Sequence, residues 1–301
     1  MTLTVRAPAK INLHLGVGAP REDGFHPLDT VYQAIGLVDD VTVSDGPGVT
    51  VSLESAGHVD GGSVPLGGDN IVVRAAALLA AHHGRPATAH VRIDKAIPVA
   101  GGMAGGSADA AATLLALDRW WDLHTSDVDL LALAAELGSD VPFALLGGTA
   151  RGRGRGELVE PVTDPATWWW VVVPAGEGLS TPDVYRHFDA LHPDAPVDPP
   201  SPDRLLTALA SGDPLALAAA LHNDLQEAAV DLRPELGSLL DLGEAEGALR
   251  GLLSGSGPTC LFLGESVEAA RAVAAALQSS YDAVLVAPGP VAGAHVVEPR
   301  R

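Results

Sequence analysis

The stretch Pro98–Ser107 has the composition of an anion-binding loop. It contains two pairs of glycines, Gly101–Gly102 and Gly105–Gly106, and a run of strong helix formers follows it. The N–H groups of a glycine-rich backbone can converge on an anion, and the start of a helix adds the positive end of its dipole. These residues predict a phosphate site, with a flexible turn at a helix start as the alternative interpretation.

Two common nucleotide-binding glycine motifs do not fit this loop. The P-loop of nucleoside triphosphatases requires a Lys and then Ser or Thr after its last glycine, whereas Gly106 is followed by Ser107 and Ala108. The dinucleotide-binding motif requires an acidic residue about twenty positions further on, at the end of a strand. Asp122 has that spacing, but it ends a predicted helix. We therefore expect a phosphate loop of another kind.

Near the start of the sequence, Lys10 and Asn12 lie two residues apart in an apolar stretch. In a strand, such residues share one face of the sheet. A buried ammonium group is costly unless a charged partner meets it. The pattern thus predicts an unidentified partner for Lys10, unless the segment is an exposed edge strand.

Three further segments carry groups that could do chemistry. Asp23-Gly-Phe-His26 combines a turn with an aromatic ring and an imidazole. Asp140 follows a predicted helix, where a carboxylate could also act as the cap of the next helix. The segment 254–259 is a second Gly/Ser turn, between two predicted strands. The spacing of the histidines does not resemble a zinc site.

Composition limits the classes of function. The chain has 301 residues, of which 47% are hydrophobic and 19% charged, and this length suits two domains. Its net charge of −20 argues against a nucleic-acid partner, because a phosphate backbone repels such a surface. The basic run Arg151-Gly-Arg-Gly-Arg155 is interpreted as a strand with one charged face.

The cysteine content and hydropathy indicate a soluble, cytoplasmic protein. Cys260 is the one cysteine, so no internal disulfide can form, and its apolar surroundings predict a buried structural thiol. No apolar run approaches the length needed to span a membrane, and the first residues lack the features of a signal peptide. We expect neither a membrane nor a nucleic acid as partner.

The first half of the sequence must supply the elements that position these groups. Alternating patterns predict strands over 3–6, 11–15, 31–37, 40–43, 49–53 and 87–94. Helical spacing predicts helices over 70–79, capped by Asp69 or Asn70, over 104–121, and over 128–137, between Ser126 and Gly138.

The second half begins after a break at about residues 160–167. Strands are predicted over 168–173, 249–253, 259–263 and 283–286, and helices over 203–211, 214–222, 234–242 and 267–279. This mixed order of strands and helices predicts an α+β fold. We expect two domains, 1–163 with a mixed sheet and the phosphate loop, and 164–301 with layered helices and strands.

In combination and order, these segments resemble the GHMP family of small-molecule kinases over nearly the whole chain. The resemblance is carried by the Pro-x-Lys-x-Asn strand at residues 8–12, the glycine loop and the Ser-Gly-Ser-Gly-Pro-Thr turn at 254–259. Other segments look most like the members that phosphorylate a cytidine-diphosphate-linked methylerythritol: 8–13, 23–26, 138–143, 147–157, 179–185 and 222–225.

This resemblance implies ATP-dependent transfer of a phosphoryl group to the tertiary hydroxyl of that substrate, in the non-mevalonate route to isoprenoid precursors. Asp140 would be the base that accepts the hydroxyl proton. Lys10 would pair with Asp140 and keep it ionised, and Asn12 would hydrogen-bond near the same centre. A tertiary alcohol is hindered and weakly acidic, so alignment and charge stabilisation must supply most of the rate.

The resemblance also implies the binding residues. Phe25 and Tyr185 would enclose the cytosine ring, His26 would recognise its edge, and Thr181 would contact the substrate. Ser107 would lie near a Mg²⁺ ion, with no carboxylate ligand identified. The ATP phosphates would be bound by the loop residues Pro98, Ala100, Gly101, Gly102, Met103, Ala104, Gly105, Gly106 and Ser107.

The sequence departs from the family pattern at several positions. Met103, Ala104 and Ala108 stand where Leu, Gly and Ser are more usual, so Ser107 is the only loop side chain left to reach a metal. Phe25 stands where Tyr is common and Tyr185 where Phe is common, exchanges that preserve stacking.

Two alternatives remain open at this stage. One is another GHMP kinase, acting on homoserine, mevalonate or a sugar, and the other is a non-catalytic ligand-binding member of the fold. The aromatic residues Phe25 and Tyr185 favour a pyrimidine-containing substrate over the first. The presence of both Lys10 and Asp140 argues against the second. A monomer and a homodimer are equally compatible with the sequence.

Overall fold

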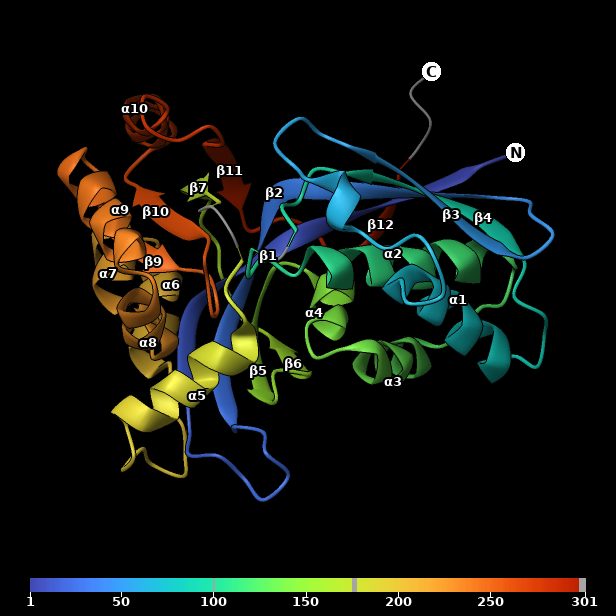
Figure 1. Ribbon diagram of the computed structural model, residues 1–301, viewed down its shortest axis with the longest axis horizontal. Coiled ribbons are helices and arrows are strands. Elements are labelled where there is room, and N and C mark those ends of the chain that lie inside the picture. The colour runs from blue at the N-terminus through green and yellow to red at the C-terminus, as the bar shows by residue number, and fades with distance from the viewer. Residues whose placement is uncertain (100, 175–177, 298–301) are drawn as a thin grey trace.

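Two sheets organise the molecule, with helices packed against both (Figure 1). The computed structural model describes residues 1–99, 101–174 and 178–297. Within that part of the chain one sheet has eight strands and the other has four. The predicted α+β class is confirmed.

The first sheet is built on two long antiparallel strands, β1 (Leu3–Val17) and β2 (Leu28–Ser44). The sequence predicted two short segments for each of them. The register of β1 against β2 shifts at Pro8/Ala9 and at Asn12/His14. These bulges interrupt the alternation of apolar and polar residues without ending the strand, which explains the difference.

The remaining strands of this sheet come from both halves of the sequence. From the first half come β3 (Val49–Ser55), β4 (Ala89–Lys95), β5 (Thr149–Gly154) and β6 (Leu158–Pro161). The short strands β8 (His222–Asn223) and β12 (His295–Val297) pair with β1 from the second half. The expected boundary at residues 163/164 thus does not separate the strands of this sheet, and the boundary itself stays a prediction.

Helices cover one side of the first sheet, as Figure 1 shows below β1–β4. They are α1 (Ile71–His82), α2 (Gly105–Trp120), α3 (Asp127–Leu137) and the short α4 (Val141–Leu146), preceded in the chain by the 3₁₀ turn Gly61–Ser63. The Asn70 side chain caps α1 and the Ser126 side chain caps α3, as predicted.

The second sheet has the order β11-β7-β10-β9. Its strands are β7 (Trp168–Val173), β9 (Arg250–Leu253), β10 (Cys260–Gly264) and β11 (Leu285–Gly289). Six helices accompany it in the described part of the chain: α5 (Thr181–Leu191), α6 (Asp203–Ser211), α7 (Pro214–Ala220), α8 (Leu225–Leu232), α9 (Pro234–Ala245) and α10 (Val267–Leu277). The sequence did not predict α5 or α8.

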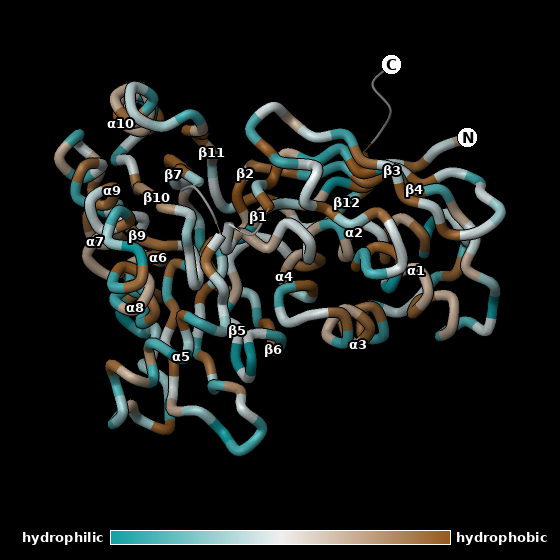
Figure 2. Tube along the Cα trace, in the orientation of Figure 1, coloured by the Kyte–Doolittle hydropathy of each residue, from teal (hydrophilic) through white to brown (hydrophobic). Residues whose placement is uncertain are grey.

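Strand β7 lies between two hydrophobic cores. Trp168, Trp170 and Val172 face a core that extends from α1 and α2 to α6 and α7, whereas Val171 and Val173 face a second core beneath α8–α10. Figure 2 shows hydrophobic residues along the strands and mainly hydrophilic ones in the loop between β1 and β2. The first core joins residues from both halves of the sequence, so the two halves pack as one unit.

Two smaller predictions can be checked against the fold. Cys260 is buried in β10, and burial raises the pKa of its thiol to about 12, as expected for a structural cysteine. The basic run forms strand β5 and the turn after it. No helix of the described residues is both long and apolar enough to cross a bilayer.

Trp170 connects the two sheets and should contribute strongly to stability. Its indole N–H donates to the Gln33 side-chain oxygen on β2, at 2.8 Å, and both residues are fully buried. Trp170→Phe leaves a cavity and an unpaired acceptor, so we expect a loss of about 2–4 kcal/mol in the free energy of unfolding, measured by denaturant titration. The matched change Trp169→Phe, at a half-buried position on the opposite face, should cost less than about 1.5 kcal/mol. Equal losses would show that Trp170 has no special connecting role.

Candidate active site

Lys10, in the middle of β1, and Asp140, just before α4, meet in the structure. The Lys10 Nζ lies 3.6 Å from the Asp140 Oδ2 and 2.8 Å from the Asn12 Oδ1, to which it donates. The Asn12 amide in turn donates to the hydroxyl of Thr30 on β2, at 2.9 Å. The expected proximity of the lysine and the carboxylate is confirmed, and Asp140 is the charged partner that the buried ammonium group requires.

The position of Asp140 leaves its carboxylate free for chemistry. It precedes α4, but its side chain accepts no capping hydrogen bond from the helix. Gly138 ends α3, and the chain then turns directly into α4, whose first turn contains Pro142. The capping role that the sequence left open is therefore not the one that Asp140 has in the structure.

Tyr32 is a member of this cluster that sequence reasoning missed. Its buried ring lies 5.5 Å from the Lys10 Nζ, measured to the ring centroid, and its hydroxyl interacts electrostatically with the Asp140 carboxylate. Burial first, and then the Asp140 charge, raise the pKa of Tyr32 well above its usual value. A Cβ atom on Gly156 would lie 2.1 Å from the Tyr32 hydroxyl, so this close approach requires glycine.

A pocket of about 240 Å³ opens over this cluster. It is lined by residues from β1, β2, the glycine loop, the turns at 139–140 and 155, α5, α8 and the turn at 255–256: Lys10, Asn12, Leu15, Leu28, Tyr32, Gly102, Ala104, Ser139, Asp140, Arg155, Thr181, Tyr185, Leu225, Gly255 and Ser256. The second Gly/Ser turn found in the sequence thus closes one wall of the pocket.

The glycine loop packs tightly against that turn. Gly102 has a φ of 76°, and a Cβ atom there would lie 2.2 Å from the Ser254 carbonyl oxygen. The Ser254 hydroxyl donates to the Gly102 carbonyl at 2.9 Å. Met103 is fully buried in the core, and its carbonyl accepts from the Lys10 N–H at 3.1 Å. Met103 can therefore serve a ligand through its backbone only.

Helix α2 begins at the end of this loop without a side-chain cap. Ala104 is its N-cap, with a φ of 56°, and no side chain accepts from the first N–H groups. Such groups are free to bind an anion. Ser107 is half-buried in the first turn, and Ala100 lies outside the described residues.

A second cavity, of about 350 Å³, lies beside the start of α2. Gly102 and Ala104 line both this cavity and the pocket at Asp140, so the glycine loop separates two adjoining spaces. The cavity beside α2 is lined by Ser63, Val64, Pro65, Asn70, Ile71, Lys95, Pro98, Val99, Gly101, Gly102, Ala104, Gly105, Gly106 and Asp109. Pro98 and all four loop glycines thus line one space that could hold a nucleotide.

A buried charge cluster forms the wall of that cavity and was not predicted. The Lys95 ammonium group donates to Asp39 at 2.6 Å and to Asp109 at 2.8 Å. Asp39 also accepts from the backbone N–H groups of Ala96 and Ile97, whereas the Asp109 Oδ1 has no hydrogen-bond partner. Burial is the main cause that raises the pKa of Asp109 well above its usual value; the Lys95 charge opposes it, and the charge of Asp39 adds to it.

The residues expected to bind a base are only partly brought together. The rings of His26 and Tyr185 lie 4.8 Å apart, and the His26 Nε2 lies 2.8 Å from the Asp189 Oδ1. Tyr185 lines the pocket at Asp140, and burial raises the pKa of its hydroxyl. Phe25 is 51% exposed and does not line that pocket, but the guanidinium of Arg155, which does, lies 5.2 Å from its ring centroid.

Thr181, at the first position of α5, lies in the same pocket. Its hydroxyl is 2.8 Å from that of Ser256 in the second Gly/Ser turn. One end of α5 therefore contributes two side chains to the pocket, Thr181 and Tyr185, one helical turn apart.

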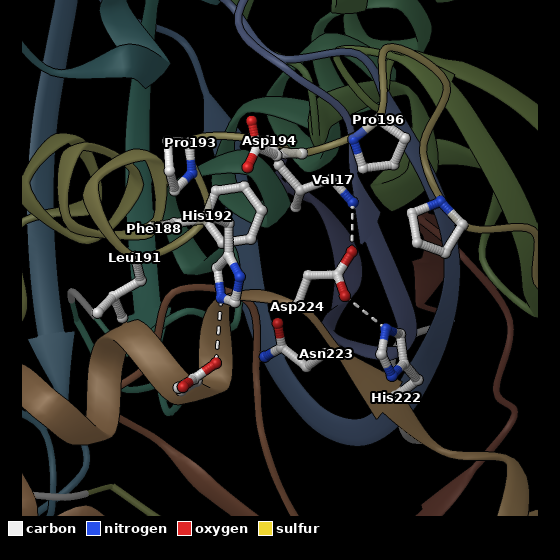
Figure 3. A pocket seen from close by; sticks show the side chains of 13 residues that line it. Val17, Phe188, Leu191, His192, Pro193, Asp194, Pro196, His222, Asn223 and Asp224 are labelled. Atoms are coloured by element: carbon white, nitrogen blue, oxygen red, sulfur yellow. Dashed lines mark hydrogen bonds and ion pairs between the residues drawn. The ribbon is translucent and has the colours of Figure 1, made fainter.

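A larger cavity, of about 530 Å³, lies away from the Lys10–Asp140 pair. Figure 3 shows His222 directed at Asp224, at 2.6 Å, with the Asp224 carboxylate also accepting from the Val17 N–H. The cavity contains neither Lys10 nor Asp140. The candidate site is therefore placed by the Lys10–Asp140 pair rather than by cavity size.

Comparison with known proteins identifies the family. Residues 70–148 match the family model described as GHMP kinases N terminal domain, and residues 205–283 match GHMP kinases C terminal. A protein of Nocardioides sp. is 67% identical over 97% of this chain and 99% of its own length. The chain belongs to the GHMP kinase family.

Two relatives that match this chain over nearly their whole length carry the same name. The Nocardioides protein and a Nocardia farcinica protein, 53% identical over 98% of this chain and 96% of its own, are both named 4-diphosphocytidyl-2-C-methyl-D-erythritol kinase. A crystal structure of 4-(cytidine 5'-diphospho)-2C-methyl-D-erythritol kinase is 34% identical, with a TM-score of 0.77, over 97% of this chain and 100% of that one. A homoserine kinase from Cytophaga hutchinsonii shares the fold: it is 19% identical, with a TM-score of 0.74, over 98% of this chain and 97% of that one.

The buried Asp109 predicts a pH dependence of stability. Its raised pKa means that, above the ordinary Asp value of about 3.8, the folded state holds a proton that the unfolded state has lost. Stability then falls as pH rises through this window, by up to roughly 1.4 kcal/mol per pH unit. Asp109→Asn should remove this component, so its stability relative to the wild type should increase with pH, measured by urea unfolding at several pH values.

The exposed Asp127 on α3 offers a matched control for this experiment. Asp127→Asn should leave the pH dependence close to that of the wild type. A difference between Asp109→Asn and the wild type that stays constant with pH would contradict the raised pKa.

Proposed function

We propose that this GHMP kinase transfers the γ-phosphoryl group of ATP to the tertiary 2-hydroxyl of 4-diphosphocytidyl-2-C-methyl-D-erythritol. The observation that carries the proposal is the Lys10–Asp140 pair, in a pocket that adjoins the cavity at the start of α2. An acceptor hydroxyl in the first space and a triphosphate in the second would meet across the glycine loop. The names and high identity of the relatives support this substrate.

In the proposed mechanism Asp140 accepts the proton of the substrate hydroxyl. Its carboxylate is paired with the Lys10 ammonium group, with the Tyr32 hydroxyl nearby, and this pairing would orient it before the substrate binds. Lys10 also offers a positive charge where negative charge develops on the attacking oxygen and the transferred group. The side-chain oxygen of Asn12 accepts from the Lys10 ammonium group and positions it, because the Asn12 amide is itself hydrogen-bonded to Thr30.

The start of α2 would bind the ATP phosphates. Its uncapped N–H groups and the adjoining glycines offer donors without side chains in the way. In kinases Mg²⁺ is bound mainly by phosphate oxygens, water and one or two protein oxygens, and it neutralises phosphate charge. Among the described residues no group of three or more His, Cys, Asp or Glu could hold a metal by itself. The single hydroxyl of Ser107 is compatible with that arrangement, and we propose it as a ligand.

The cytosine ring would bind near His26 and Tyr185. We propose that Tyr185 stacks on one face of the ring and Phe25 approaches the other, while Thr181 contacts the substrate. The Nε2 of His26 is engaged by Asp189, so its Nδ1 and its backbone groups are available to the base. These contacts account for a preference for cytidine over substrates that lack a base.

A phosphorylation assay tests the function directly. The purified protein, with ATP and Mg²⁺, should phosphorylate 4-diphosphocytidyl-2-C-methyl-D-erythritol and leave homoserine, mevalonate and sugars unchanged, as followed by ³¹P NMR. Asp140→Ala should slow the reaction by roughly 10²–10⁴, the range for a positioned acid–base group, with ATP affinity little changed. Turnover of homoserine or mevalonate instead would refute the substrate, and near-normal turnover by folded Asp140→Ala would refute the base.

Gly106 provides the cleanest test of the nucleotide cavity. A Cβ atom there would meet nothing closer than Ile71, at 4.0 Å, so a larger side chain fits the fold but enters the cavity. Gly106→Val should weaken ATP binding at least tenfold in calorimetry, while leaving the binding of cytidine diphosphate unchanged. Gly48→Val, in the open turn between β2 and β3, is the control for the general cost of such a change. Unchanged ATP affinity in Gly106→Val would place the nucleotide elsewhere.

A further inference from the structure

The three arginines of the run at residues 151–155 have different surroundings. Arg151 forms a double hydrogen bond with Asp29: its Nε donates to Oδ1 at 2.7 Å and its Nη2 donates to Oδ2 at 2.5 Å. Arg153 points to an exposed partner, Glu160, at 3.6 Å. Arg155 alone of the three lines the pocket that contains Asp140. The run therefore does more than give a strand one charged face.

The turn after β5 fixes the backbone of Arg155 and leaves its guanidinium loosely held. Gly154 and Gly156 on either side have φ values of 73° and 103°, and the Arg155 N–H donates to the Glu157 carboxylate at 2.6 Å. The guanidinium Nε, by contrast, lies 3.7 Å from that carboxylate, beyond hydrogen-bond distance. Its donors thus remain available to a ligand.

The charges around the pocket favour an anion at Arg155. Among the described lining residues, the basic side chains are Lys10 and Arg155, and the acidic one is Asp140. Asp140 is paired with Lys10, which leaves the guanidinium as the excess positive charge. This is notable in a chain with a net charge of −20, whose surface in general repels anions.

We infer that Arg155 binds the diphosphate of the substrate and so determines specificity for a nucleoside-diphosphate-linked acceptor. This inference rests on the proposed function. In that substrate the diphosphate connects the cytidine to the carbon chain that carries the reacting hydroxyl. Arg155 lies between the expected positions of the reacting hydroxyl and the cytosine ring. It lines the pocket that contains Asp140, and its guanidinium lies over the ring of Phe25. A planar guanidinium can bind two phosphate oxygens at once.

Binding of cytidine, cytidine monophosphate and cytidine diphosphate tests the assignment by calorimetry. For the wild type, affinity should increase along this series. Arg155→Met keeps an unbranched side chain beside Phe25 but removes the charge, and it should weaken cytidine diphosphate binding roughly 10- to 100-fold, as for hydrogen bonds to a charged group. Its affinity for cytidine should stay within about twofold of the wild type. Arg155→Lys, which keeps the charge but not the planar donors, should give an intermediate loss.

Arg153→Met is the matched control. Arg153 lies two residues earlier, near the end of β5, and does not line the pocket. The substitution should change none of the three affinities. Thermal unfolding of each variant verifies that it is folded.

Three results would overturn the inference. Equal losses for cytidine and cytidine diphosphate in Arg155→Met would mean that the arginine only supports Phe25. Unchanged cytidine diphosphate affinity in that variant would refute the diphosphate contact while leaving the proposed function intact. A wild-type protein that binds no cytidine diphosphate and phosphorylates another substrate would refute both.

Discussion

The need to pair one buried ammonium group organises the pocket at Lys10 and Asp140. Lys10 lies in the interior of β1, where an uncompensated charge would be strongly unfavourable. Its partners come from separate elements: Asn12 from the same strand, Asp140 from the turn before α4, and the ring of Tyr32 from β2. The Lys10 backbone also binds the Met103 carbonyl, so the same residue holds the glycine loop in place. Lys10 thus lines the pocket at Asp140 and, through its backbone, holds the loop that separates this pocket from the cavity beside α2.

Much of this arrangement could be predicted from local sequence. The glycine loop leading into a helix, the capping residues Asn70 and Ser126, and the spacing of Lys10 and Asn12 are features of a few neighbouring residues, and the structure agrees with each. The partner of Lys10 is distant in sequence, and it was identified through family resemblance and the cost of burying a charge.

The features that escaped prediction depend on tertiary contacts or weak local signals. Helix α5 carries Asp183, Arg186, His187 and Asp189, and its buried residues are Val184 and Phe188. With so few apolar positions, its sequence gives only a weak helical signal. Tyr32 and Asp109 occur in ordinary strand and helix sequences, and nothing nearby indicates that they meet Asp140 or Lys95. The interrupted alternation in β1 had a different cause, since bulges divide the pattern of a strand that is continuous in space.

The pairing of β1 has a consequence for how the protein is made on the ribosome. Residues 4–6 of β1 pair with β12, and residues 14–15 pair with β8. The parts of β1 on either side of Lys10 therefore pair with strands from the last third of the sequence. Synthesis delivers the lysine first and these neighbours last. Contacts so distant in sequence form slowly, because a long loop must close before they can be made. A nascent chain therefore carries Lys10 for most of translation in a segment whose strand hydrogen bonding is still incomplete.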